Sequence, residues 1–102
     1  MRIIASSTLK AFAKKHPETA PAPSLSHWST MAKAAGWASA NDVRNAFSKA
    51  KVLNGERVRF EIAGGNYRLI VAFDFERPIA FIKFLGTHAE YDKIDPLKAS
   101  QF

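Results

Sequence analysis

The sequence predicts an α+β fold in which N-terminal helices pack on one face of a small antiparallel sheet. The spacing of the apolar residues supports this prediction, because their period changes from about 3.6 in the first half to 2 from residue 50 onward. The chain has 102 residues, so residues 1–102 are expected to form a single domain. Its hydrophobic content of 47% is sufficient for a core, and the absence of cysteine excludes a disulfide framework.

A short strand and a helix are predicted at the start of the chain. Arg2-Ile3-Ile4 is a β-branched run, and the hydroxyl groups of residues 6–8 are expected to cap a helix that Pro17 ends. Leu9 and Phe12 are three residues apart and mark the apolar face of this helix.

Two further helices are predicted before the first long strand. The proline-rich residues 21–23 form a stiff connector to a second helix, which Ser24 caps and which ends near Gly36. Ser39 and Asp42 have the spacing of a capping box, so a third, short helix is expected there. Consecutive helices of this kind favour a helical hairpin.

The second half of the chain predicts a meander of strands. Asn54-Gly55 is a strong hairpin signal and separates residues 51–53 from an alternating strand at 57–62. The next strand, 67–75, is mostly apolar on both faces, as expected at the centre of a sheet. The last strand, 79–85, is apolar except for one lysine.

A final helical turn is predicted after the last strand. Thr87 and Glu90 have capping-box spacing, and His88 and Tyr91 are then expected on one side of the turn. The tail beyond Pro96 is expected to be loose.

The net charge is +6, and most of it lies in the first half of the chain. Residues 1–50 hold seven basic and two acidic residues, which gives +5. This excess predicts a polyanion or an acidic protein as partner, although a small domain also needs net charge for solubility. No apolar stretch is long enough for a bilayer span or a signal peptide, so we expect a soluble protein in the cytoplasm.

The candidate chemistry comes from placement rather than from a local motif. The sequence has no glycine-rich phosphate loop, and its three scattered histidines do not predict a metal site, so neither a metal nor a cofactor is expected. The basic side chains predicted to share one face of the sheet are Arg57, Arg59, Arg68 and Lys83. The titratable residues expected near this face, at the end of the last strand, are His88, Tyr91 and Lys93. Cations that bind phosphate, together with a histidine that moves a proton, are typical of a metal-free ribonuclease.

Each of these residues also has a purely structural interpretation. The two arginines of the first long strand alternate with apolar residues, as on any solvated strand face. A cation is rarer in strands as apolar as those that hold Arg68 and Lys83, but pairing with Glu61 or Asp74 would explain it. His88 is equally consistent with a first helical turn that has no catalytic role.

Two segments resemble the HigB toxins, which are RelE-like toxic components of bacterial type II toxin–antitoxin systems. They are Gly65-Asn66-Tyr67-Arg68-Leu69-Ile70-Val71 and, above all, Phe84-Leu85-Gly86-Thr87-His88-Ala89-Glu90-Tyr91-Asp92-Lys93-Ile94. Met1-Arg2-Ile3-Ile4 and Ala35-Gly36-Trp37 also fit, so the resemblance extends over residues 1 to about 95.

The resemblance implies a RelE-like fold and an mRNA interferase, an endoribonuclease that cleaves mRNA on the translating ribosome. It implies neutralisation by a HigA-like antitoxin with a helix-turn-helix domain, and contact with operator DNA only through that antitoxin. The catalytic residues that it suggests are Arg68, His88, Tyr91 and Lys83, and the residues expected to bind RNA are Arg57, Arg59, Lys93 and Asn66.

Two other functions remain open at this point. ParE-like toxins share the fold and inhibit DNA gyrase without cleaving RNA. An RNA- or ribosome-binding module that has lost its activity would keep the basic face and would need neither His88 nor Tyr91. A histidine and a tyrosine beside arginines favour cleavage.

Overall fold

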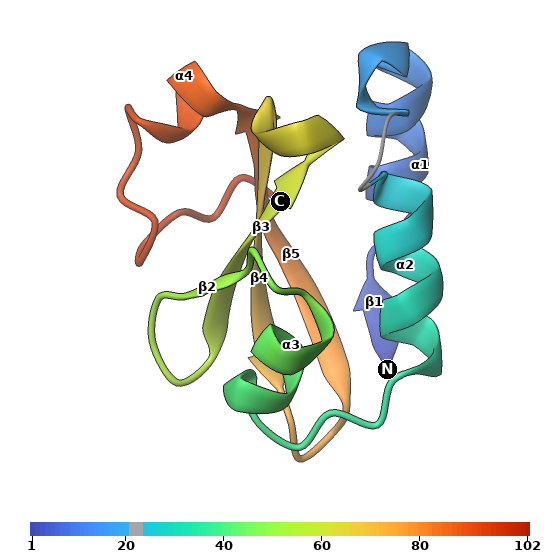
Figure 1. Ribbon diagram of the computed structural model, residues 1–102, viewed down its shortest axis with the longest axis vertical. Helices are drawn as coiled ribbons and strands as arrows, with labels where there is room; N and C mark the ends of the chain where they lie inside the picture. Colours follow the sequence, from blue (N-terminus) through green and yellow to red (C-terminus); the bar gives the residue numbers. More distant parts are fainter. Residues whose placement is uncertain (21–23) are drawn as a thin grey trace.

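A five-stranded sheet with the order β1-β5-β4-β3-β2 forms the centre of the computed structural model, which describes residues 1–20 and 24–102 (Figure 1). The strands are β1 (Arg2–Ile4), β2 (Lys51–Val52), β3 (Arg57–Ile62), β4 (Tyr67–Asp74) and β5 (Ile79–Thr87). The α-helices are α1 (Ser6–Lys15), α2 (Leu25–Ala34), α3 (Ala40–Ala46) and α4 (His88–Tyr91), and the 3₁₀ turns are η1 (Pro17–Thr19) and η2 (Ala63–Gly65). The α+β prediction is confirmed.

The sheet is mixed, which corrects the prediction of an antiparallel sheet. Strands β2 to β5 form the predicted antiparallel meander, whereas β1 pairs in parallel with β5, with Ile3 opposite Ala80. The start of β1 is held by the terminal ammonium group of Met1, which donates hydrogen bonds to the carbonyl groups of Ala32 (3.0 Å) and Lys33 (3.1 Å) at the end of α2. No local sequence pattern predicts this link between the terminus and the helix.

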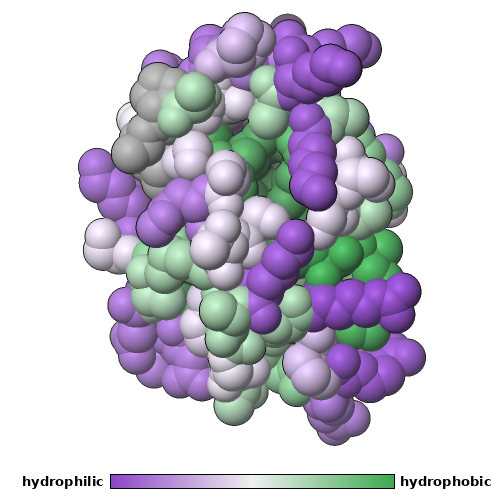
Figure 2. Space-filling view, turned by 90° about the vertical axis from the view of Figure 1, so that its right-hand side faces the viewer, coloured by the Kyte–Doolittle hydropathy of each residue, from purple (hydrophilic) through white to green (hydrophobic). Residues whose placement is uncertain are grey.

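The helices α1 and α2 lie together on one side of the sheet, and α4 and the tail lie on the other (Figure 1). Leu9 and Leu25 carry the buried faces of α1 and α2, as predicted. Trp28 is fully buried, and its ring meets the Phe60 ring edge-on at 5.3 Å between centroids. Figure 2 looks onto this helix layer, whose outer surface carries many hydrophilic side chains. None of the described helices combines the length and the apolar character that a membrane span requires.

Of the caps predicted for the first three helices, those of α2 and α3 are present. The Ser24 hydroxyl accepts a hydrogen bond from the His27 backbone N–H at 3.0 Å. The Ser39 hydroxyl accepts from the Asp42 N–H, but the Asp42 carboxylate accepts from Ala38 instead of closing the box on Ser39. Aspartate is shorter than the glutamate usual at this position, so its reach differs.

The cap predicted for α1 is wrong. Ala5 occupies the N-cap position, and no side chain caps this helix, because the helix already begins at Ser6. The hydroxyl residues 6–8 are therefore inside its first turn. The predicted connector at residues 21–23 lies outside the described residues.

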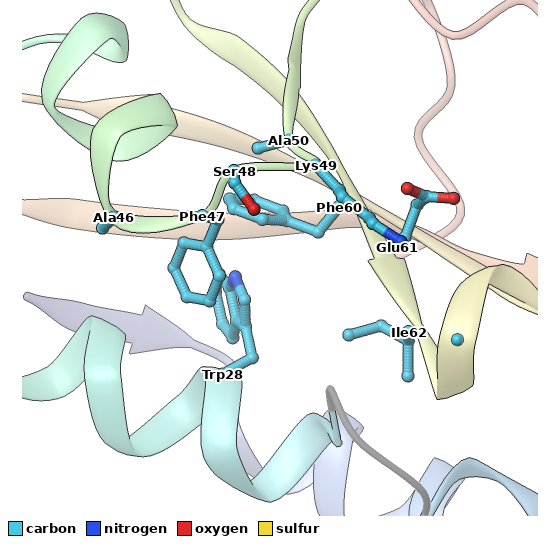
Figure 3. A pocket seen from close by; sticks show the side chains of 10 residues that line it. Trp28, Ala46, Phe47, Ser48, Lys49, Ala50, Phe60, Glu61 and Ile62 are labelled. Carbon is cyan, nitrogen blue, oxygen red and sulfur yellow. The ribbon is translucent and has the colours of Figure 1, made fainter.

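A hollow with a volume of about 360 Å³ opens between α2, the link from α3 to β2, and β3 (Figure 3). Trp28, Phe47, Phe60 and Ile62 give it mainly apolar walls. The three of these that come from α2 and β3 belong to the core between helices and sheet, so the hollow lies on the helix-covered side and not on the side of the predicted basic face.

The tail beyond Pro96, expected to be loose, makes specific contacts with the sheet. The Gln101 backbone N–H donates to the Lys83 carbonyl at 2.8 Å, and the Gln101 side-chain oxygen accepts from the Leu85 N–H at 2.8 Å. The Arg57 guanidinium holds the middle of the tail through backbone carbonyls. These partners lie far apart in sequence, so local composition gave no sign of them.

Candidate functional site

The sheet face opposite α1 and α2, which we call the open face, carries the predicted basic residues. Cross-strand neighbours point to the same face of a sheet, so the register of β3, β4 and β5 defines this surface. Its three rows are Arg57, Ala72 and Phe81; Arg59, Ile70 and Phe84; and Glu61, Arg68 and Gly86. The predicted common face for the arginines is thereby confirmed.

A β-bulge explains the single lysine in the apolar strand β5. The register between β4 and β5 shifts at Ile70 and Val71, so Phe84 faces one of them and Ile82 faces the other. Lys83 is the extra residue of the bulge, and an extra residue of this kind bends the strand and redirects its side chain. The side chain is half-buried, and its ammonium nitrogen lies 5.6 Å from the centre of the Phe81 ring.

Arg68 is held inside the protein by partners of its own. Its Nη1 lies 3.4 Å from Glu61 Oε1 and also donates to the Gly65 carbonyl. Only 9% of the side chain is exposed, and its Nε has no partner among the described residues. The structure therefore contains the ion pair with Glu61 that the purely structural interpretation of Arg68 requires. A phosphate at the surface would not reach this guanidinium in the observed conformation.

Gly65 is required by this ion pair. Its φ of +100° is unfavourable for a residue with a side chain, and a Cβ atom there would lie 2.8 Å from Glu61 Oε1. The turn that leads into β4 is thus shaped around the carboxylate that neutralises Arg68.

The two segments that carry the family resemblance meet at the start of α4. The His88 backbone N–H donates to the Asn66 carbonyl at 3.0 Å. Thr87 and Glu90 form the predicted capping box, in which each side chain accepts from the other residue's N–H. The Thr87 backbone N–H, and then its hydroxyl, lower the pKa of Glu90 below its usual 4.5. Gly86 leaves no space for a side chain, since a Cβ would lie 2.9 Å from the Phe84 ring.

His88, Tyr91 and Arg59 gather at this end of the open face. The Arg59 guanidinium carbon lies 5.8 Å from the centre of the Tyr91 ring, and that ring lies 6.2 Å from the Phe84 ring. His88 Nδ1 is 3.1 Å from Asp92 Oδ2, and both side chains are more than half exposed. An exposed histidine thus lies one helical turn from a half-buried tyrosine, which packs against a half-buried arginine and the buried Phe84 ring.

The other predicted RNA-binding residues are more dispersed. Lys93 and Asn66 are exposed close to α4, and their backbone N–H groups donate to the carbonyls of Glu90 and Ala63. Arg57 is two rows away from Arg68, and its Nη1 donates to the carbonyls of Pro96 (3.0 Å) and Ala99 (2.9 Å). The sequence pattern did not indicate that the tail occupies this arginine.

The largest pKa shift lies on the helix side of the sheet. The Tyr67 hydroxyl donates to Glu18 Oε1 at 2.6 Å, and this bond, with burial, raises the pKa of Tyr67 to about 12. The same bond lowers the pKa of Glu18. This pair fastens η1 to β4 and does not belong to the open face.

In residues 1–20 and 24–102, no group of three or more His, Cys, Asp or Glu side chains is arranged to hold a metal ion.

A family model described as HigB toxin, RelE-like toxic component of a toxin-antitoxin system, matches residues 22–94. The match includes all the candidate residues from Arg57 to Lys93. No curated protein matches the chain in sequence.

We expect Gly65→Ala to destabilise the protein by about 1–3 kcal/mol, because a side chain at this φ is strained and would displace Glu61 from Arg68. Gly55→Ala is the matched control, since a Cβ at Gly55 meets nothing within 4 Å. Urea unfolding of both variants measures the difference. Equal stabilities would contradict the proposed role of the turn.

The capping box predicts a pH dependence at acidic pH. The folded-state pKa of Glu90 is lowered, so its contribution to stability is present above its usual pKa of 4.5 and is lost as the pH falls through the folded value. We therefore expect the melting temperature of Glu90→Gln to fall less steeply with decreasing pH below about 5 than that of the wild type. Thr87→Ala, which removes only the hydroxyl bond, should lie between them; parallel curves for all three proteins would refute this assignment.

Proposed function

Because the chain belongs to the HigB toxin family, the RelE-like toxic components of toxin–antitoxin systems, we propose that it is an endoribonuclease that cleaves mRNA on the translating ribosome. The observation that carries this proposal is the gathering of His88, Tyr91 and Arg59 at one end of the open face. The cytoplasm, where messages are translated, is the corresponding location.

The proposed reaction is an attack of a ribose 2′-hydroxyl group on the adjacent phosphorus atom. The 2′-oxygen–phosphorus bond forms, the bond to the 5′-oxygen breaks, and a cyclic phosphate and a free 5′-hydroxyl group result. A base takes the proton of the 2′-hydroxyl, and an acid gives a proton to the 5′-oxygen. Cations stabilise the charge that the phosphate gains in the transition state.

His88 is the leading acid or base in this scheme. Its Nδ1 faces Asp92, so the carboxylate orients the imidazole and leaves Nε2 for the substrate. Tyr91 stands beside it, with a ring on which a base can stack and a hydroxyl group that can take part in proton transfer. Arg59 and Lys83 supply the positive charge; Arg59 lies in the row that ends at Phe84, and Lys83 is the bulge residue just before Phe84.

We propose an indirect role for Arg68. Its guanidinium is engaged by Glu61 and Gly65, so it acts as a positioning residue that fixes the turn before β4. This turn supplies the Asn66 carbonyl that receives the His88 N–H. Loss of Arg68 is therefore expected to lower thermal stability and activity together.

A toxin of this family implies an antitoxin partner, and we propose a HigA-like helix-turn-helix protein that brings operator DNA to the complex. The proposed docking surface is the groove between α1 and α2. The buried Leu9 and Leu25 line its floor, and the exposed Lys10 and Lys33 line its rim. Neither helix contains an acidic residue, so an acidic amphipathic helix of the partner is the complementary surface.

We expect His88→Ala to reduce cleavage by a factor of about 10² to 10⁴ without changing the melting temperature, because the residue is exposed and its proposed role is proton transfer rather than packing. His27→Ala, an exposed histidine on α2, is the matched control and should cleave normally. The assay combines protein, ribosomes and mRNA and maps the new 5′ ends. Absence of cleavage with wild-type protein would favour a ParE-like inhibitor or an inactive binding module.

The proposed chemistry uses only side chains, so we expect cleavage to continue in excess EDTA. A ribosome-free substrate is needed in this experiment, because ribosomes themselves require magnesium. Activity that disappears on chelation and returns with a divalent ion would refute the metal-independent mechanism.

The antitoxin surface is tested by charge reversal. Lys10→Glu with Lys33→Glu should weaken antitoxin binding, because the groove would then repel an acidic helix. Lys49→Glu with Lys51→Glu makes the same change in net charge away from the groove and serves as control. Calorimetry with the helix-turn-helix protein encoded beside the toxin measures the affinities, and equal losses in the two variants would exclude this location.

A further inference from the structure

The C-terminal tail crosses the open face and is tied to both of its sides. We call residues 95–101 the strap. At β3, the Arg57 Nη1 donates to the carbonyls of Pro96 and Ala99, at 3.0 and 2.9 Å. At β5, Gln101 accepts from the Leu85 N–H and donates to the Lys83 carbonyl. The strap thus runs across the sheet between two fixed ends.

The outer end of the strap occupies a free strand edge. Strand β1 covers the edge of β5 only as far as Phe81, where Ile4 is its last partner. Beyond this point, the backbone groups of Lys83 and Leu85 would be unpaired without Gln101. Free edges pair readily with other chains, so the strap protects the edge next to the lysine of the candidate site.

The strap is held by hydrogen bonds more than by apolar burial. Leu97 and the terminal Phe102 are each 51% exposed, although both are large and apolar. Segments with few buried apolar contacts open at a low free-energy cost compared with the core. The strap can therefore leave the sheet without unfolding the helix layer or the meander.

The acceptors that the strap offers to Arg57 are neutral carbonyl oxygens. A phosphate is an anion that can accept two parallel hydrogen bonds from one guanidinium, so it adds ionic attraction to bonds that a neutral carbonyl makes without it. We infer that the strap is a displaceable cover of the open face: RNA takes Arg57 from Pro96 and Ala99, and residues 95–101 leave the sheet. This inference rests on the proposed RNA-cleaving function and adds a conformational step that precedes it.

Removal of the strap should tighten RNA binding. If only open molecules bind RNA, the apparent Kd of the full chain equals the intrinsic Kd divided by the fraction of molecules that are open. The test compares the full chain with a chain ending at Asp95, using a single-stranded 2′-O-methyl RNA that cannot supply an attacking hydroxyl group. We expect the shortened chain to bind at least about threefold more tightly. Weaker or equal binding by a chain with an unchanged melting temperature would overturn the inference.

A second variant keeps the chain complete in case truncation impairs folding. Gln101→Ala removes the side-chain acceptor of the Leu85 N–H and should also tighten RNA binding. Ser100→Ala, at the exposed neighbouring residue, is the matched control and should bind as the wild type does. If Gln101→Ala binds no more tightly than Ser100→Ala, the strap does not compete with RNA.

Hydrogen exchange shows the movement directly. The Gln101 and Leu85 amides should exchange faster when the 2′-O-methyl RNA is bound, because their partners separate. Unchanged or slower exchange in the presence of bound RNA would show that the strap stays in place, and would refute the cover while leaving the ribonuclease proposal intact. RNA binding by neither the full nor the shortened chain would refute both.

Discussion

Strand β4 is buried on both of its faces, and the rest of the molecule is arranged to satisfy this constraint. Leu69 and Val71 on one face are completely buried in the core under α1 and α2. Ile70 on the other face is equally buried although it lies outside that core. The open face therefore needs its own cover, and α4 with the tail supplies it on the side away from the helices (Figure 1). The candidate site lies within this second layer.

The second layer also determines the electrostatics of the site. Arg59 lies in a row whose other members, Ile70 and Phe84, are apolar and buried, and Lys83 directly precedes Phe84 in β5. Charges beside a low-dielectric floor interact more strongly with a bound phosphate than charges surrounded by water. Arg68 is the opposite case, because Glu61 already neutralises it. The basic side chains of this face thus have two roles: Arg59 and Lys83 can bind a phosphate, whereas Arg68 is part of a structural ion pair.

Sequence alone predicts the features that depend on local periodicity. The alternating burial of β3, the central position of β4 and the Thr87–Glu90 box all follow from residue types at fixed spacings. Features that depend on distant partners were not predictable in this way. The parallel pairing of β1 joins residues at opposite ends of the chain, and the contacts of Arg57 reach the tail about forty residues away. For Arg68, the sequence left a phosphate and Glu61 as equal candidates, and only the register of β3 and β4 places Glu61 directly opposite.

The ammonium group of Met1 donates to carbonyls at the end of α2, a position where a helix carries partial negative charge. The Met1 nitrogen therefore acts as a C-terminal helix cap, a role normally taken by the backbone N–H groups of the residues that follow the helix. An acyl group or a peptide fused before Met1 replaces this charged group, which has three donors, with a neutral amide that has one. A group attached to this nitrogen therefore changes the charge at the end of α2, at the point where β1 begins.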